Sequence, residues 1–172
     1  IVAATIIMQL HYCQVKPLIS LQLKRIAHKI MGKPRLSIIV IVYKMPEQAR
    51  NTLLSLSTNY QKGVTEEEYE VIVVENASDR PMGKAGIEGL QGNFSYYYRE
   101  EKLPTPVFAI NFGAKKAKGT HIGLMIDGAR VATPGMVRGI LQASRISNNA
   151  VVAVPGYHLG KTVQQEAMNS GY

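Results

Sequence analysis

Short runs of β-branched and aromatic residues alternate with amphipathic stretches from residue 36 onward. Five of these runs predict strands, at residues 37–43, 71–74, 94–98, 121–126 and 150–154. The first run is almost continuously apolar, which is typical of a strand buried on both faces of a parallel sheet. The pattern therefore predicts a sheet with at least one strand in its interior.

Helix signals lie between the predicted strands. Three helices are expected to begin at or beside a proline, which suits the first helical position: Pro46, Thr105-Pro106 and Pro134-Gly135. We expect the second helix to run to Lys118 and to end at Gly119, a residue type that favours helix ends. Residues 83–92, with glycine at every third position, predict a weak helix or a loop. The alternation of strands and helices indicates an α/β domain with a mostly parallel sheet.

Residues 1–34 form a lead segment whose pattern differs from that of the domain predicted over residues 35–172. Apolar residues recur near helical spacing over residues 18–31, with Lys24 and Arg25 between them. Such a basic amphipathic helix either rests on an anionic membrane surface, through residues 18–33, or is solvated and leads into the domain. We favour the solvated helix and a cytoplasmic protein, with peripheral membrane contact as the alternative.

The net charge has less bearing on the partner than its size suggests. The chain carries a charge of +8, which favours a nucleic-acid partner. However, residues 1–35 hold six basic residues and no acidic one, whereas residues 36–172 hold 14 basic and 12 acidic residues. The three consecutive tyrosines at 96–98 offer rings for stacking on bases, but alternate residues of a strand point to opposite faces. We therefore expect no nucleic acid as the partner and keep a nucleic-acid module as the weakest alternative.

Length and composition narrow the class further. A chain of 172 residues with 46% hydrophobic residues is typical of one soluble globular domain. Cys13 is the only cysteine, which excludes an internal disulfide framework. No apolar run reaches the roughly 18 residues that a membrane-spanning helix needs.

Acidic residues follow two of the predicted strands. Glu75 and Asn76 follow the second strand along the chain, and Asp127 follows the fourth. Ligands of open parallel sheets bind outside the carboxyl ends of the strands, where these residues would meet. Glu75 could accept hydrogen bonds from a nucleobase or a ribose, and Asp127 could hold a divalent cation that bridges phosphates. The alternative is that both acids only accept hydrogen bonds from turn amides.

Four motifs in order carry a family resemblance. They are residues 37–43, residues 71–79 (Val-Ile-Val-Val-Glu-Asn-Ala-Ser-Asp), residues 111–119 and residues 126–129 (Ile-Asp-Gly-Ala). Their order and spacing resemble the nucleotide-binding half of family 2 glycosyltransferases, over roughly residues 35–155. The resemblance implies a GT-A fold, which is a Rossmann-like, mostly parallel sheet flanked by helices. It also implies transfer of a sugar, with inversion, from a nucleotide-diphosphate sugar to a glycan, lipid or small-molecule acceptor that the sequence does not identify.

The resemblance also implies roles for single residues. Val42 and Tyr43 would line the nucleobase pocket, with backbone and ring respectively. Glu75, followed by Asn76, would match the acid near the base and the ribose, where family members usually carry Asp. Asn111 would match the Asn of the family's Arg-Asn pair.

The metal motif of the family is altered in this sequence. Asp127 would match the first acid of the Asp-x-Asp motif and thus a ligand of Mg²⁺ or Mn²⁺. Ala129 stands at the second acid and removes a charged ligand, and Ile110 stands where the family often has Arg. One hypothesis is that Arg130 supplies positive charge to the diphosphate, because a guanidinium matches phosphate geometry. The other is that Arg130 is an ordinary surface arginine.

The resemblance bears on catalysis as well. An inverting transfer needs a general base, which in the family comes from the later half of the protein. The last acid here is Glu166, so we expect the base to lie beyond Tyr172 and these 172 residues alone to transfer no sugar. A non-catalytic relative that keeps the fold and binds a nucleotide is the alternative function.

Overall fold

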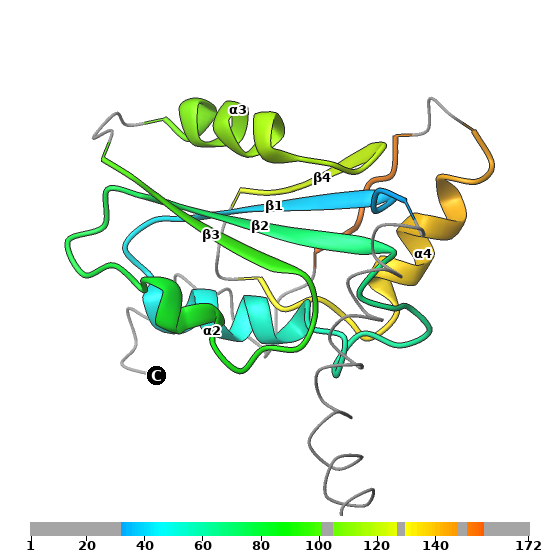
Figure 1. Ribbon diagram of the computed structural model, residues 1–172, viewed down its shortest axis with the longest axis horizontal. Coiled ribbons are helices and arrows are strands. Elements are labelled where there is room, and N and C mark those ends of the chain that lie inside the picture. The colour runs from blue at the N-terminus through cyan, green and yellow to red at the C-terminus, as the bar shows by residue number, and fades with distance from the viewer. Residues whose placement is uncertain (1–31, 101–104, 127–129, 148–150, 157–172) are drawn as a thin grey trace, which may run out of the picture.

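The computed structural model describes residues 32–100, 105–126, 130–147 and 151–156. Within them, four parallel strands form one sheet in the order β3-β2-β1-β4 (Figure 1). The strands are β1 (Leu36–Val42), β2 (Tyr69–Asn76), β3 (Phe94–Arg99) and β4 (His121–Met125). The helices are α2 (Pro46–Ser55), the 3₁₀ helix η1 (Lys84–Ile87), α3 (Val107–Lys116) and α4 (Met136–Ala143).

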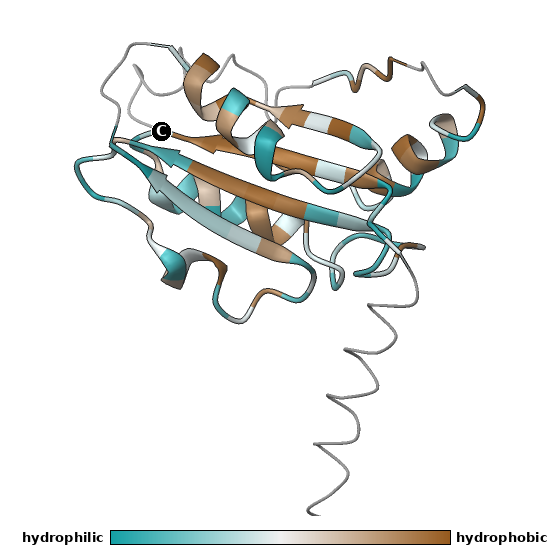
Figure 2. Cartoon of the chain, turned by 45° about the horizontal axis from the view of Figure 1, so that its top comes forward, coloured by the Kyte–Doolittle hydropathy of each residue, from teal (hydrophilic) through white to brown (hydrophobic). Residues whose placement is uncertain are grey.

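The two central strands are the buried part of the sheet. Every residue of β1 and of β2 is buried, as their β-branched runs predict. Figure 2 shows the same contrast in hydropathy, because apolar residues concentrate in the middle of the sheet and the edge strand β3 is more polar. Val42 of β1 pairs with Glu75 of β2, which pairs with Tyr98 of β3. The carboxyl ends of these three strands therefore lie level at one edge.

Helices cover both faces of the sheet. Leu53 of α2 and Val137 and Leu141 of α4 are buried in one apolar cluster with Val40 and Val73. On the other face, α3 buries Ala109 in a second cluster with Ile39. Figure 1 shows α3 on one side of the sheet and α2 on the opposite side. This three-layer arrangement is the α/β fold that the sequence predicts.

A buried carboxylate fixes the amino-terminal edge of the sheet. Glu70 is 3% exposed and accepts hydrogen bonds from the hydroxyl of Ser37 (2.6 Å) and the backbone N–H of Lys118 (2.7 Å). The Ser37 hydroxyl in turn accepts from the N–H of Gly119 at 2.8 Å. A β-carbon on Gly119 would lie 2.7 Å from the backbone N of Ser37, so only glycine fits this turn between α3 and β4.

A glutamine side chain sets the start of α4. The first residues of a helix leave N–H groups without partners inside the helix, and α4 has no capping side chain of its own. The Gln61 amide oxygen accepts from the N–H groups of Gly135 and Val137, both at 3.2 Å, and its nitrogen donates to the carbonyl of Thr133 at 3.0 Å. The segment that follows β4 is thereby attached to the loop after α2.

Four predicted strands and three predicted helices are confirmed, with boundaries that differ by at most three residues. The fifth strand, predicted at 150–154, is wrong for its described part, because residues 151–156 pair with none of the described strands. Val151 is 97% exposed, and an apolar run without a neighbouring strand has no ladder to join. The lead helix predicted within residues 1–34 lies outside the described residues. Among the described helices, none is long and apolar enough to cross a membrane.

Candidate functional site

The loops after β1 and β2 are joined at the carboxyl edge of the sheet. The backbone N–H of Lys44 donates to the hydroxyl of Ser78 at 2.9 Å, and its Nζ lies 2.8 Å from a carboxylate oxygen of Asp79. Lys44 and Ala77 have φ angles of +54° and +35°, which residues with a β-carbon rarely adopt. Both of these backbone positions are thus strained, and they lie side by side at one edge. Such strain is concentrated at functional sites in proteins.

The lysine of this edge is stabilised as a cation. The hydrogen bond that Lys44 donates to Asp79, together with the charge of Asp79, raises the pKa of Lys44 above its ordinary value. Its Nζ also lies 5.3 Å from the ring centroid of Tyr43. Lys44 is therefore a cation at the end of β1, and its charge is paired with the carboxylate of Asp79.

The two residues predicted at the end of β1 differ in exposure. Val42 is fully buried and its side chain belongs to the core on the α2 face, so only its backbone lies at the edge. Tyr43 is 51% exposed, with the ammonium of Lys44 over its ring. The role of this backbone and this ring in a nucleobase pocket stays a prediction, because neither residue lines the groove described below.

Glu75 is fully buried and accepts hydrogen bonds from three donors. The N–H of Met82 donates to both carboxylate oxygens, at 2.9 and 3.1 Å, and the N–H of Gly83 donates at 3.4 Å. The hydroxyl of Tyr96 on β3 donates at 2.6 Å. Burial, followed by the hydrogen bond to Glu75, raises the pKa of Tyr96, which keeps this hydroxyl protonated. Of the two hypotheses for Glu75, the geometry matches hydrogen bonding to nearby amides.

The two asparagines predicted for the site, Asn76 and Asn111, belong to the face of the sheet opposite that of Glu75. Asn76 ends β2 and is 7% exposed, and alternation along the strand puts its side chain on the face opposite that of Glu75. Asn111 lies on α3 and is exposed. Gly113 of the same helix packs against Ile39 of β1, which shows the face of the sheet that α3 covers. The structure therefore puts Asn76 and the helix of Asn111 on one face of the sheet and Glu75 on the other.

Arg130 follows β4 and is attached to α2. Its backbone N–H donates to the hydroxyl of Thr52 at 3.1 Å, and its side chain is exposed. A β-carbon on Gly156 would lie 3.7 Å from Nη1 of Arg130, which puts Gly156 beside its guanidinium. Asp127 and Ala129 lie outside the described residues.

The described residues do not form a metal site. No group of three or more His, Cys, Asp or Glu side chains comes together among them. The carboxylate of Glu75 already faces N–H and O–H donors, which is the wrong environment for a cation ligand.

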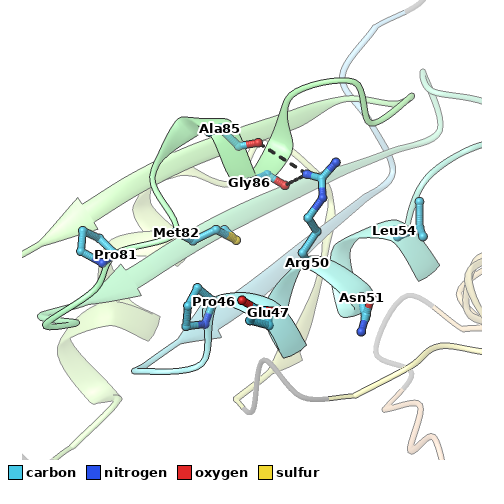
Figure 3. Close-up of a pocket in the computed structure, with 9 residues that line it drawn as sticks. All are labelled: Pro46, Glu47, Arg50, Asn51, Leu54, Pro81, Met82, Ala85 and Gly86. Atoms are coloured by element: carbon cyan, nitrogen blue, oxygen red, sulfur yellow. Dashed lines mark hydrogen bonds between the residues drawn. The ribbon is translucent and has the colours of Figure 1, made fainter.

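A groove beside this edge was not predicted from the sequence. It has a volume of about 550 Å³ and lies between α2 and the segment from Pro81 to η1 (Figure 3). Arg50 bridges its two walls by donating to the carbonyl of Gly86 at 2.7 Å. The lining residues are Pro46, Glu47, Arg50, Asn51, Leu54, Pro81, Met82, Ala85 and Gly86. The sequence predicts the helix that begins at Pro46 and a weak helix or loop over residues 83–92, but no period in it indicates that these two segments face each other.

The aromatic and basic residues considered for nucleic-acid binding contact one another instead. Tyr97 packs edge-to-face on Phe112 of α3, with centroids 5.3 Å apart, and Lys116 lies 5.5 Å from the centroid of Tyr97. Tyr96 packs on the opposite face, against the cluster that includes α2. The three tyrosines therefore form no common stacking surface, as their alternation predicts.

Comparisons with known proteins give the same fold. The model of the family described as Glycosyl transferase family 2 matches residues 37–169. The crystal structure of S. aureus TarS 1-349 is similar, with a TM-score of 0.57 and 19% sequence identity over 65% of this chain and 32% of that one. A second crystal structure of S. aureus TarS has the same TM-score, with 20% identity over 65% of this chain and 20% of that one.

The similarity to TarS covers only part of the TarS chains. The chain spans about a third or less of the length of the TarS chains, and their sequence identity supports the fold alone. No curated protein matches the sequence significantly. The family match covers most of the chain and includes β1, β2, β4 and the segment that contains Asp127. The chain belongs to glycosyltransferase family 2.

Proposed function

We propose that this chain is the donor-binding part of an inverting glycosyltransferase. It would bind a nucleotide-diphosphate sugar at the carboxyl edge of the sheet and present the sugar to an acceptor. Membership in family 2 supports sugar transfer, and the fold supports a ligand at this edge. We assign no residue of this chain to acceptor binding or to the role of general base.

The observation that carries this proposal is the joined pair of loops after β1 and β2. Lys44 and Ala77 keep strained backbones there, and the loops are held together through Ser78 and Asp79. The exposed ring of Tyr43 stands at the same edge and offers a flat surface for a nucleobase. A preformed edge with an exposed ring and a half-exposed lysine, which a diphosphate would share with Asp79, suits a nucleoside diphosphate.

Arg130 is the second cation of the proposed site. It follows β4, where the metal motif of the family is altered, and its exposed guanidinium can pair with two phosphate oxygens. We infer that Arg130 supplies part of the charge that a metal ligated by two acids would provide.

A thermal-stability titration tests the proposal. UDP or GDP at about ten times its Kd is expected to stabilise the chain by about 1.4 kcal/mol and to raise Tm by about 3–6 °C. Arg130→Ala is expected to weaken binding about tenfold, because a charge-assisted hydrogen bond is lost. Arg145→Ala removes the same charge from an exposed position after α4 and is expected to bind like the wild type. Unchanged affinity in Arg130→Ala would contradict the role of Arg130.

A non-catalytic relative that only binds a nucleotide is the second candidate. Ala129 at the second acid of the metal motif favours it, as does the commitment of Glu75 to protein donors. Repeating the titration with Mn²⁺ and with a nucleotide-diphosphate sugar separates the two. Because these 172 residues alone are expected to transfer no sugar, the readout is binding. Tighter binding of the nucleotide-diphosphate sugar than of the diphosphate supports the enzyme, whereas no preference for the sugar nucleotide supports the relative.

A further inference from the structure

The buried Glu75 is aimed at a loop and not at the open edge. Its carboxylate accepts from the N–H groups of Met82 and Gly83 and from the hydroxyl of Tyr96, on the face of the sheet that α2 covers. The side chain is 0% exposed. A nucleobase or ribose donor at this carboxylate would have to displace one of the three protein donors. Each displaced group would then lose a charge-assisted hydrogen bond inside the protein.

The loop that Glu75 holds forms a wall of the groove. Pro81 and Met82 face Pro46 and Glu47 of α2 across it (Figure 3). Glu75 therefore connects the end of β2 with Met82 and Gly83, seven and eight residues later. Tyr96 completes the contact from β3 by donating its hydroxyl proton to Glu75.

We propose that Glu75 is a positioning residue that, with Tyr96, fixes residues 81–83 beside the donor site and does not itself contact the nucleotide. This inference rests on the proposed function. It predicts that Glu75 contributes to affinity for nucleotides in general and does not select the base.

Two substitutions and two controls test the role of Glu75. Glu75→Gln replaces an acceptor oxygen with an N–H₂ group that faces N–H donors, and Tyr96→Phe removes one donor while keeping the ring. Glu88→Gln makes the same charge change on the nearby exposed loop. Tyr98→Phe makes the same change two residues along β3, where the hydroxyl has only a 3.5 Å contact to the carbonyl of Ser78.

The first readout needs no ligand. Amide hydrogen exchange at Met82 and Gly83 is expected to accelerate about tenfold or more in Glu75→Gln and by a smaller factor in Tyr96→Phe, because a charged acceptor or its partner is lost. Both controls should leave it unchanged. Unchanged exchange at Met82 and Gly83 in Glu75→Gln would overturn the positioning role.

The second readout uses UDP and GDP with the 172-residue chain. Glu75→Gln should weaken both nucleotides by the same factor, within about twofold, and the double variant with Tyr96→Phe should lose no more than Glu75→Gln alone. The carbon-13 resonance of the Glu75 carboxylate should not move when UDP saturates the wild type. A shift of that resonance, or a loss specific to one base, would show direct contact and overturn the proposal. Failure of the wild type to bind either nucleotide would instead overturn the proposed function, while the exchange readout would still decide the role of Glu75 in the loop.

Discussion

Tyr69 begins β2 with its ring fully buried, and its hydroxyl donates to the carbonyl of Leu56 at 2.7 Å. Burial raises the pKa of Tyr69 to about 12, because a phenolate is poorly solvated in the core. The neutral form is thus favoured in the folded state relative to the unfolded chain. The contribution of the neutral Tyr69 to the free energy of unfolding is complete below pH 10 and is lost as the pH rises from about 10 to about 12.

Tyr69→Phe is expected to make alkaline unfolding less steep. The variant loses one hydrogen bond and about 1 kcal/mol at neutral pH, but it no longer has this phenol to ionise between pH 10 and 12. Denaturant titrations at several pH values measure both effects. Tyr60→Phe, at a half-buried position, serves as the control. Parallel pH profiles for Tyr69→Phe and the wild type would contradict this account of Tyr69.

The sequence predicts where Glu75 lies but not what it contacts. Its place after a buried strand locates it at the carboxyl edge, because parallel strands end together there. Its partner Tyr96 depends on the register between β2 and β3, and Met82 and Gly83 depend on an irregular loop. Neither follows a period in the sequence. Lys44 is similar, because its strained backbone depends on a hydrogen bond to Ser78 in another loop.

At the scale of elements, helices α3 and α4 differ in how closely their backbones approach neighbouring side chains. Gly113 of α3 lies so near β1 that an added β-carbon would be 2.6 Å from Cγ2 of Ile39, whereas one on Gly139 of α4 would meet nothing within 4 Å. Glycine is required at the first position by packing. At the second it only lowers helix propensity.

Substitution of these two glycines by alanine is expected to have opposite effects. Gly113→Ala should destabilise the fold by about 1–3 kcal/mol, because Ile39 or the helix must move in a filled core. Gly139→Ala should stabilise it by about 0.5–1 kcal/mol through reduced backbone entropy in the unfolded chain. Chemical denaturation of both variants provides the measurement. A gain in stability for Gly113→Ala would contradict the close approach of α3 to β1.

The strands that have a neighbouring strand to pair with were predicted correctly. The strand predicted at 150–154, whose described part pairs with no described strand, was not. The run at 37–43 becomes β1 because strands on both sides supply hydrogen bonds and helices cover its faces. Residues 151–154 have a similar apolar composition, but their described part pairs with no described strand. Composition predicts the tendency to form a strand, whereas pairing depends on distant parts of the chain.

Across the whole molecule, the two edges of the sheet have separate tasks. The amino-terminal edge is closed by Glu70 and Ser37, which hold the turn between α3 and β4. The carboxyl edge carries the strained loops and the exposed cations of the proposed site. Substitutions at the carboxyl edge are therefore expected to lower nucleotide affinity without lowering stability. Substitutions at the amino-terminal edge are expected to lower stability without lowering nucleotide affinity.

Ser37→Ala tests this separation. It removes a donor to Glu70 and an acceptor for Gly119, so it should destabilise the fold by about 1–3 kcal/mol. Its affinity for UDP or GDP should equal that of the wild type at a temperature where both are folded. Denaturation and calorimetric titration on the same sample give the two values. A large loss of affinity with unchanged stability would contradict the assignment of the edges.

The most direct test of the central claim is to map nucleoside-diphosphate binding residue by residue. We predict that titration of the 172-residue chain with UDP or GDP shifts the backbone amide resonances of residues 43–44 and 77–79, together with that of Arg130. The resonances of Ser37, Glu70 and Gly119, at the opposite edge, should stay in place. Shifts confined to the opposite edge, or no shifts at about 10 mM of either nucleotide, would contradict a donor site at the carboxyl edge of the sheet.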